Sequence, residues 1–369
     1  MQLTVTSSTE LAITKSDGSV VAIHPLWLRE RCQDALSIDR GTRQRLYDPS
    51  DLDLEIALAD IHERSPGEYR VRFSDGHEAD FSAAQILAEA ALEPGDADCV
   101  APELWDAALM SLPRGTWRAA ASDAEHFAWL EQFLRFGFII FCGVPTDRQE
   151  LFKIAETFGF TRTTNFGALF DVRSTPEASD LAYTSIALDP HTDNPYRNPV
   201  PGVQLLHCLV NETSGGLSTL VDAFAVVAAL EARDPEAFRI LSSTAVRFRY
   251  TDARTELIAS AAPIDLDVTG KVRAVHFSPR LDFVPLLPRR ELVAYYRARR
   301  AFDHMLRAPE FEIRFLLRPG DLLMMDNCRL LHGRTGFNPT EGLRYLQGCY
   351  IDIDGPRSLY RVLRKRLSP

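Results

Sequence analysis

The spacing of apolar residues changes along the chain, and each change predicts a different kind of element. In the first part, short apolar or β-branched stretches such as residues 20–23 and 69–73 are bounded by the turn sequences Ser16-Asp17-Gly18 and Ser74-Asp75-Gly76. Such stretches between turns are typical of short strands. The pattern predicts a small N-terminal β-rich domain over residues 1–95.

The segment that follows has the composition of a linker. Residues 91–102 (ALEPGDADCVAP) are rich in Pro, Gly, Ala and Asp, which favours irregular structure. With 369 residues the chain is long enough for two domains. We therefore expect a second, larger domain over residues 103–369.

The second domain is expected to open with a helix and a buried strand. Ser122 and Glu125 have the spacing of a capping box, and apolar residues then recur every three or four positions up to Gly137. The uninterrupted apolar run 138–141 is typical of a strand covered on both faces.

Short strands dominate the rest of the pattern. A second pair with capping-box spacing, Thr146 and Gln149, predicts a helix that ends near Gly159, and residues 289–306 predict a longer one. The predicted strands are residues 203–209, 218–221, 245–250, 314–317, 322–325 and 346–351. Many short strands with few helices between them favour a mainly β fold with flanking helices, an antiparallel sandwich or barrel, over a Rossmann sheet.

Composition and charge narrow the choice of partners. The net charge of −10 argues against nucleic acid, and no apolar run is long enough for a membrane span. Residues 1–15 lack the basic and apolar segments of a secretion signal, and the six cysteines form no CxxC pair. We therefore expect free thiols in a reducing cytoplasm, and a homodimer only because that state is common among soluble enzymes.

Two histidines and one aspartate carry the candidate chemistry. His191 and Asp193 are two residues apart, so on an extended strand both side chains point to one side, and His332 follows in a predicted strand–turn unit. Two imidazoles and a carboxylate form the facial triad of non-haem Fe(II) oxygenases, which leaves positions open for a co-substrate and O2. The His-x-Asp motif alone is weak, because either histidine can simply be hydrogen-bonded.

Arg344 strengthens the metal-site hypothesis. It follows His332 by twelve residues and lies in the otherwise apolar segment 343–346. A guanidinium in such a strand needs a carboxylate partner, which a dicarboxylate co-substrate would provide as a bidentate pair. The alternative is an internal salt bridge to one of the chain's own acids.

Further motifs follow one another in a fixed order. They are Leu181-Ala182-Tyr183-Thr184, His191-Thr192-Asp193, PGVQLLHC at 201–208, Gly215-Gly216, VDAF at 221–224, and His332-Gly333-Arg334 with Arg344. With these motifs, residues 137–352 resemble the taurine dioxygenase superfamily of Fe(II)/2-oxoglutarate enzymes, and more closely its γ-butyrobetaine and trimethyllysine hydroxylase branch. Trp27-Leu28-Arg29 and Asp75-Gly76-His77 resemble the small N-terminal domain of that branch.

The resemblance implies a double-stranded β-helix (jelly-roll) core and a hydroxylation reaction. Fe(II) would be held by His191, Asp193 and His332. 2-Oxoglutarate would chelate the iron and pair its far carboxylate with Arg344, assisted by Ser218 or Thr219. O2 would take the last metal position, ascorbate would serve as an activator in vitro, and an unactivated C–H bond would be hydroxylated.

The resemblance also implies a substrate class, a small quaternary-ammonium zwitterion similar to γ-butyrobetaine. An aromatic cage would hold the ammonium group by cation–π attraction. Its positions in this chain are Phe166, Phe170, Tyr183 and Tyr350. Core packing is the alternative explanation for these aromatic residues, and the two Phe rings imply a weaker or differently shaped cage.

Three polar positions depart from the branch pattern or leave the substrate open. Asp180 would add an anionic partner for a cationic group, and Asn194 replaces an expected aromatic residue. Arg280 falls near the segment that recognises the acidic end of the substrate, where it would pair with a carboxylate or a phosphonate, or instead form a surface salt bridge. Trimethyllysine and a trimethylammonio-alkylphosphonate such as 2-(trimethylammonio)ethylphosphonate are therefore open alternatives.

The small domain departs from its relatives at a metal site. Relatives can hold a structural zinc there with three Cys and one His. Cys32 and His77 match that pattern, but Asp34 and Ser37 stand where further Cys would be. Two soft ligands are too few for a closed tetrahedral site, so no tight structural zinc is expected.

Other function classes stay open at this point. A non-catalytic metal-binding module of the same fold is disfavoured by the intact triad and Arg344. A zinc hydrolase would need a general base near the metal and no anchor for a dicarboxylate. A nearer rival is a hydroxylase of sulfonates or other substrates that are not betaines.

Overall fold

The computed structural model of the protein describes residues 2–15, 17–90, 100–173 and 184–368. The chain divides into two compact units, residues 1–97 and 98–369. No helix in the described parts combines the length and the apolar composition that crossing a membrane requires. The five cysteines in these parts are free thiols, and Cys99 lies outside them.

The first unit is built on two small antiparallel sheets. One contains β1 (Gln2–Ser7), β2 (Glu10–Thr14) and β3 (Val20–Ile23), and the other contains β4 (Leu58–Ser65), β5 (Glu68–Phe73) and β6 (Glu78–Ser82). The helices are α1 (Pro25–Glu30), the 3-10 turn Pro49–Asp51 and α2 (Ala83–Ala90). Alternate residues of β5, Tyr69, Val71 and Phe73, are buried in one core with Leu11 and Ile13. The predicted strands 20–23 and 69–73 are confirmed.

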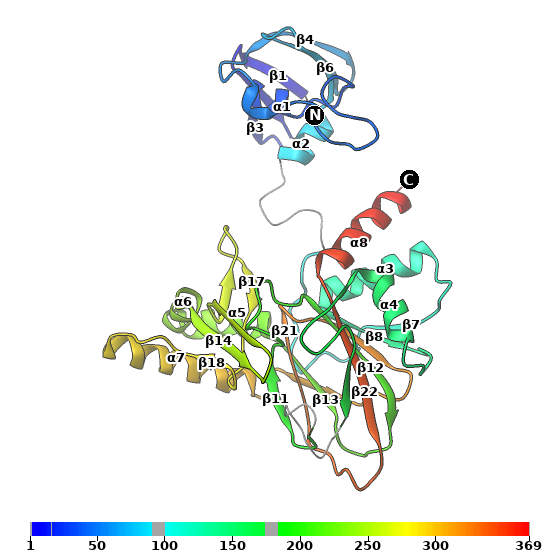
Figure 1. The fold of residues 1–369 in the computed structure, drawn as a ribbon. Coiled ribbons are helices and arrows are strands. Elements are labelled where there is room, and N and C mark those ends of the chain that lie inside the picture. The colour runs from blue at the N-terminus through cyan, green and yellow to red at the C-terminus, as the bar shows by residue number, and fades with distance from the viewer. Residues whose placement is uncertain (1, 16, 91–99, 174–183, 369) are drawn as a thin grey trace. The chain divides into compact units, whose positions relative to one another are not determined.

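The second unit is a jelly roll of two facing sheets (Figure 1). The larger sheet has the order β10 (Phe170–Arg173), β22 (Arg344–Ile351), β12 (Val203–Asn211), β20 (Leu322–Asp326), β8 (Phe138–Cys142) and β7 (Arg114–Thr116), with β9 (Thr161–Arg162) beside β22. The smaller sheet has the order β11 (Leu188–His191), β21 (Leu330–Arg334), β13 (Ser218–Asp222) and β19 (Glu312–Phe315). The predicted double-stranded β-helix is confirmed.

Helices cover the outer faces of both sheets. The helices α3 (Asp123–Phe136), α4 (Glu150–Phe158) and α8 (Asp354–Leu367) pack against the larger sheet. On the other side lie α5 (Ala223–Arg233), α6 (Pro235–Ser243) and α7 (Arg289–Leu306), with β14 (Val246–Thr251), β15 (Glu256–Ala261), β18 (Asp282–Phe283), β16 (Ile264–Leu266) and β17 (Val272–Val275). Figure 1 shows these two groups on different sides of the jelly roll.

Strand β8 is covered on both faces, by the other sheet and by helices, which explains its continuous apolar run. Phe138 and Ile140 point between the two sheets, whereas Ile139 and Phe141 pack under the helices. Both faces of the strand are therefore removed from water, which a strand of alternating polarity would not tolerate. All four side chains are fully buried, as the run predicted.

The helix ends test the capping predictions. Ser122 and Glu125 form the full reciprocal capping box of α3, and Gly137 ends that helix in the left-handed conformation at φ 79°. The second predicted box is wrong. The N-cap residue of α4 is Gln149, and its side chain makes no capping hydrogen bond. A turn from Asp147 to Glu150 precedes the helix, so Thr146 lies outside it.

The strand and helix limits follow the sequence pattern closely, with one shift. The helix 289–306 is confirmed as α7, and the strands predicted at 203–209, 218–221, 245–250, 322–325 and 346–351 are all present. The strand predicted at 314–317 is displaced to Glu312–Phe315 because the turn of Arg318–Asp321 follows it closely.

His207 is a buried polar residue on the helix-covered face of β12. It is fully buried, and neither ring nitrogen has a hydrogen-bond partner among the described residues. Burial lowers its pKa to about 4, against the opposing effect of Glu150. The folded state therefore takes up this proton at lower pH than the unfolded state, and stability is lost as the pH falls from about 6.5 towards 4.

We expect that replacement of His207 by Leu makes the free energy of unfolding depend less strongly on pH below neutrality. Urea unfolding at pH 7.5 and at pH 5 measures how much unfolding free energy is lost on acidification, and this loss should be smaller in His207→Leu than in the parent protein. Over the full titration of His207 the difference should reach up to about 3 kcal/mol. The same substitution at the exposed His304 is the control. Equal losses in the parent protein and His207→Leu would show that another group causes the acid sensitivity.

Candidate metal centre and substrate cavity

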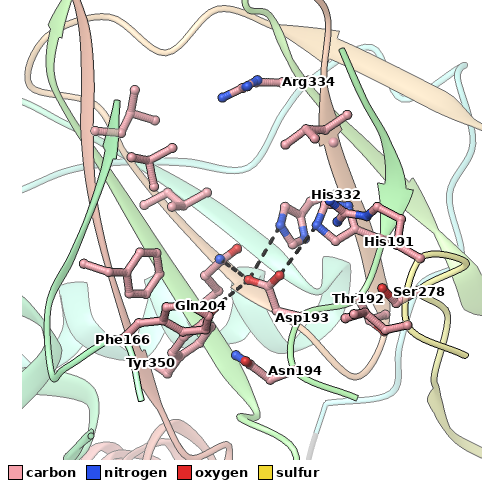
Figure 2. Close-up of a pocket in the computed structure, with 18 of the residues that line it drawn as sticks. Phe166, His191, Thr192, Asp193, Asn194, Gln204, Ser278, His332, Arg334 and Tyr350 are labelled. Carbon is pink, nitrogen blue, oxygen red and sulfur yellow. Dashed lines mark hydrogen bonds and ion pairs between the residues drawn. The ribbon is translucent and has the colours of Figure 1, made fainter. Parts of the chain in front are cut away.

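The three predicted metal ligands lie together in a cavity of the second unit (Figure 2). Antiparallel pairing of β11 with β21 places His191 directly opposite His332, and the Asp193 carboxylate faces both imidazole rings. The Nε2 atoms of His191 and His332 are 3.6 and 3.8 Å from the two carboxylate oxygens of Asp193. One ligand atom from each residue lies within 4.8 Å of the others, a spacing that a single metal ion can span.

A hydrogen bond orients His191, and the surroundings of His332 and Asp193 favour the protonation states that metal binding requires. The Nδ1 of His191 is 2.9 Å from the carbonyl oxygen of Asp189, so it carries the proton and leaves Nε2 for a metal. Burial lowers the pKa of His332 to about 4 although Asp193 opposes the shift. Burial alone would raise the pKa of Asp193, but the two imidazoles and a hydrogen bond from Tyr350 hold it well below its ordinary value. A carboxylate and neutral imidazoles are the ligand forms of these residues.

Two side chains hold one oxygen of the Asp193 carboxylate. The Tyr350 hydroxyl donates to Oδ2 over 2.7 Å, and the Gln204 amide donates to the same oxygen over 2.5 Å. The other oxygen, Oδ1, is left for a metal ion. Gln204 is not among the predicted site residues. Its signal in the sequence is a polar residue within the apolar run of β12.

Asn327 holds the backbone of the same ligand. It lies in the turn between β20 and β21, accepts from the Asp193 N–H over 2.7 Å and donates to the Asp193 carbonyl over 3.0 Å. A third bond of 2.9 Å goes to the carbonyl of Pro201. The amide thus joins the ligand segment after β11 to the turn that leads to His332. Sequence analysis missed this role, because only the folded chain brings the two segments together.

The cavity, about 140 Å³ in volume, gathers most of the other predicted site residues. The lining includes Phe166, Phe170, Asn194, Ser218, Arg280, Arg344 and Tyr350 together with the triad. Thr219 lies on the other face of β13 and is not among the lining residues. Asp180 and Tyr183 lie outside the described residues.

Arg344 is a buried cation without an acidic partner in the described parts of the chain. Its side chain donates only to the carbonyl of Gly216, over 3.2 Å, while Nε has no partner there. The guanidinium also lies 5.5 Å from the ring centre of Phe337. Burial lowers the pKa of Arg344, but an arginine stays charged. The alternative of an internal salt bridge is therefore not realised among the described acids, and the cation is suited to an anion in the cavity.

Gly216 makes room for this arginine. Its φ is +65°, and a Cβ atom there would lie 2.7 Å from the Nε of Arg344. Both the backbone conformation and the close approach require glycine. The buried guanidinium thus explains Gly216, whereas a Cβ atom at Gly215 would lie 2.6 Å from the carbonyl oxygen of Gly336.

Aromatic rings form one wall of the cavity. Phe170 lies 5.2 Å from Tyr350, and Phe166 lies 5.6 Å from Tyr250, measured between ring centres. Tyr250 in turn stacks on Tyr196 at 5.1 Å. Neither Tyr196 nor Tyr250 is predicted from the sequence, since nothing there distinguishes a cavity aromatic from a core aromatic.

Asn194 occupies a strained position beside the triad. It is buried with φ +52°, and its side-chain oxygen accepts a hydrogen bond from the Tyr196 hydroxyl. Its Nδ2 has no partner among the described residues. A buried donor at the cavity surface is suited to a polar group of a ligand.

The segment 276–281 reaches the cavity from the other side. Ser278 is 1% exposed, and its hydroxyl has no described partner. Arg280 lines the same cavity although its side chain is largely exposed.

The four residues at the expected zinc position of the first unit are also neighbours. Asp34 Oδ2 lies 2.9 Å from His77 Nε2 and accepts a 2.9 Å hydrogen bond from Ser37. Burial raises the pKa of the Cys32 thiol to about 12. The carboxylate and the imidazole thus satisfy each other, and one ligand atom each of Cys32, Asp34 and His77 lies within 4.8 Å of the others, a spacing that a single metal ion can span. The absence of tight zinc stays a prediction.

Comparison with known proteins adds two matches to family models. Residues 112–350 match the model described as taurine catabolism dioxygenase TauD, TfdA family. Residues 4–86 match the model described as γ-butyrobetaine hydroxylase-like, N-terminal. The two matches fall on the two compact units of the chain.

Individual relatives match over nearly the full length. The γ-butyrobetaine dioxygenase of Pseudomonas sp. strain AK-1 is 35% identical over 360 residues, which cover 96% of this chain and 94% of that protein. The human γ-butyrobetaine dioxygenase is 30% identical, with 93% and 91% covered. Among solved structures, asparagine oxygenase superposes with a TM-score of 0.50 at 19% identity, covering 62% of this chain and 78% of that one. This structural similarity concerns the fold alone.

Proposed function

This chain belongs to the TauD/TfdA family of taurine catabolism dioxygenases, and on that premise we propose that it hydroxylates a small quaternary-ammonium zwitterion similar to γ-butyrobetaine. It is an Fe(II)- and 2-oxoglutarate-dependent dioxygenase. The observation that carries the proposal is one cavity that contains the triad, a wall of aromatic rings and Arg344, which has no acidic partner in the described parts of the chain. Full-length similarity to two γ-butyrobetaine dioxygenases supports the substrate class.

The triad would hold the iron, and the surrounding residues would fix its geometry. Iron bound there supplies the activation of O2 and the oxidation of the substrate C–H bond. Tyr350 and Gln204 keep Oδ2 of Asp193 engaged, so that Oδ1 is presented to the metal. Asn327 fixes the backbone of the same ligand. These contacts hold the ligands in position before the co-substrate arrives.

Arg344 would bind the far carboxylate of 2-oxoglutarate. A planar guanidinium offers two parallel N–H donors to a carboxylate, and burial removes the competing water. Ser218 lines the cavity too and would add a hydroxyl donor. Thr219 has no part in this proposal.

The zwitterion would lie between the aromatic wall and the segment 276–281. Ring faces of the predicted Phe166, Phe170 and Tyr350 would attract a quaternary ammonium group by cation–π interaction, and Tyr250 would add a further ring. Arg280 and the hydroxyl of Ser278, which has no partner among the described residues, would bind the acidic end. Because Arg280 pairs equally well with a phosphonate, 2-(trimethylammonio)ethylphosphonate is the second candidate. Asp180 and Tyr183 remain predicted contributors.

The proposal is tested by succinate formation with Fe(II), ascorbate, 2-oxoglutarate and O2. The panel contains γ-butyrobetaine, trimethyllysine, 2-(trimethylammonio)ethylphosphonate, taurine and no substrate. We expect one trimethylammonium compound to stimulate succinate well above the reaction without substrate, and Zn in place of Fe(II) to give none. Stimulation by taurine alone would contradict the aromatic-wall proposal, and iron-loaded protein that forms no succinate would contradict the oxygenase.

The cellular setting is part of the same proposal. We infer a cytoplasmic enzyme, which the free thiols support, and a homodimer, which rests on the frequency of that state. Light scattering after size-exclusion chromatography measures the oligomeric state.

A further inference from the structure

Thr192, between two metal ligands, is hydrogen-bonded to the neighbouring segment 277–281, part of which lines the cavity. The Thr192 N–H donates to the carbonyl of Phe277 over 2.8 Å. In return the Phe277 N–H donates to Oγ1 of Thr192 over 3.0 Å. Thr192 is 3% exposed, so neither bond competes with bulk water. One threonine therefore uses its backbone and its hydroxyl to hold one residue of another segment.

Phe277 is in turn fixed from its far side. Its ring is 5% exposed and contacts Phe302 of α7 edge-on, with ring centres 5.8 Å apart. The residue is thus held between a helix core and the metal-ligand segment. The next residue, Ser278, has the buried hydroxyl without a described partner, and Leu281 N–H closes a turn on the Ser278 carbonyl over 2.9 Å. Figure 2 shows Thr192 and Ser278 on the same side of Asp193.

The hydroxyl of Thr192 is the replaceable part of this connection. Valine has the same branched shape, so it would keep the extended backbone of the motif. It would leave the buried Phe277 N–H without an acceptor, which is costly away from water. Serine would keep the acceptor and lose only a methyl group. The pair Thr192→Val and Thr192→Ser therefore separates the hydrogen bond from the shape of the side chain.

We propose that Thr192 is a positioning residue that sets the distance between the metal ligands and the substrate-binding segment 277–281. This inference rests on the proposed function, in which that segment binds the acidic end of the zwitterion. The distance decides which length of zwitterion places its reacting carbon at the metal. Thr192 thus contributes to selectivity for chain length without touching the reacting atoms.

The substrate test uses the full-length enzyme with Fe(II) and 2-oxoglutarate. Calorimetric titration without O2 should show at least tenfold weaker binding of the preferred zwitterion to Thr192→Val, and steady-state assays should show the loss mainly in KM rather than kcat. The ratio of the affinities of Thr192→Val for the preferred zwitterion and for a homologue one methylene longer should be at least fivefold smaller than in the parent enzyme. Thr192→Ser should stay within about threefold of the parent enzyme. Valine and serine variants that bind equally would overturn the role of the hydroxyl.

Hydrogen–deuterium exchange tests the connection without any substrate. The amide of Phe277 should exchange at least tenfold faster in Thr192→Val than in the parent enzyme or in Thr192→Ser. If no zwitterion is bound by the parent enzyme, the proposed function fails, and exchange alone still decides whether Thr192 holds the segment. Unchanged exchange at Phe277, or a loss of Fe(II) stoichiometry in Thr192→Val but not Thr192→Ser, would overturn the proposal.

Discussion

Asp193→Asn should lower Fe(II) affinity by more than about a hundredfold and abolish detectable turnover. The loss of a direct ligand exceeds the 10–100-fold effect typical when only a hydrogen-bond partner of a ligand is removed. The neutral amide removes the single negative charge of the triad, while both imidazoles stay in place. Iron content after dialysis and succinate formation with saturating 2-oxoglutarate measure the two effects.

Asp189→Asn is the matched control for this change. Asp189 lies two residues before His191, but its carboxylate is exposed and pairs with Arg307. Its backbone carbonyl, which orients His191, is retained in the variant. Asp189→Asn should bind iron like the parent enzyme. Iron bound by Asp193→Asn at the parent's affinity would exclude Asp193 as a ligand.

Arg344→Met should raise the KM for 2-oxoglutarate by at least about thirtyfold, because loss of a buried, hydrogen-bonded charge pair costs about 2–5 kcal/mol. The same change should stabilise the protein in the absence of 2-oxoglutarate. An unpaired buried guanidinium opposes folding, and methionine of similar length fills the space without a charge. A variant that binds 2-oxoglutarate more weakly but unfolds at higher temperature would show that the charge of Arg344 serves ligand binding rather than folding.

Kinetics and thermal unfolding of three variants test this prediction. Arg344→Lys keeps the charge but not the two parallel donors, so it should lie between the parent enzyme and Arg344→Met. Arg318→Met, at an exposed position, should change neither quantity. A KM for 2-oxoglutarate within threefold of the parent in Arg344→Met would show that the co-substrate binds elsewhere.

Much of the strand framework and the pair His191 and Asp193 could be predicted because their signals are local, whereas His332, 139 positions beyond Asp193, could be assigned only together with Arg344 and the family resemblance. The apolar run of β8 and the His-x-Asp spacing depend on neighbours in sequence. Other elements were missed for physical reasons. The helix α8 is rich in arginine, and only Pro356, Tyr360 and Leu363 are buried, so its apolar face is too narrow to stand out.

The missed site residues share a different cause. Gln204, Asn327 and Thr192 act through bonds to residues that are distant in sequence, at separations of 11, 134 and 85 positions. No pattern along the chain reports such pairings. The helices α5 and α6 did carry local signals, since Asp222 and Asp234 cap them, but these signals were not recognised.

The pairing of His191 with His332 across β11 and β21 constrains evolutionary change in the strands more than in the segments between them. A shift of that register by one residue would turn a ligand away from the metal, so the frame tolerates little alteration. The helices α5–α7 and the segment 276–281 all lie between the two histidines in sequence. Insertions, deletions and substitutions there can reshape the contacts to the substrate while the register persists. A lineage with this architecture can therefore acquire new substrates without rebuilding its oxidation chemistry.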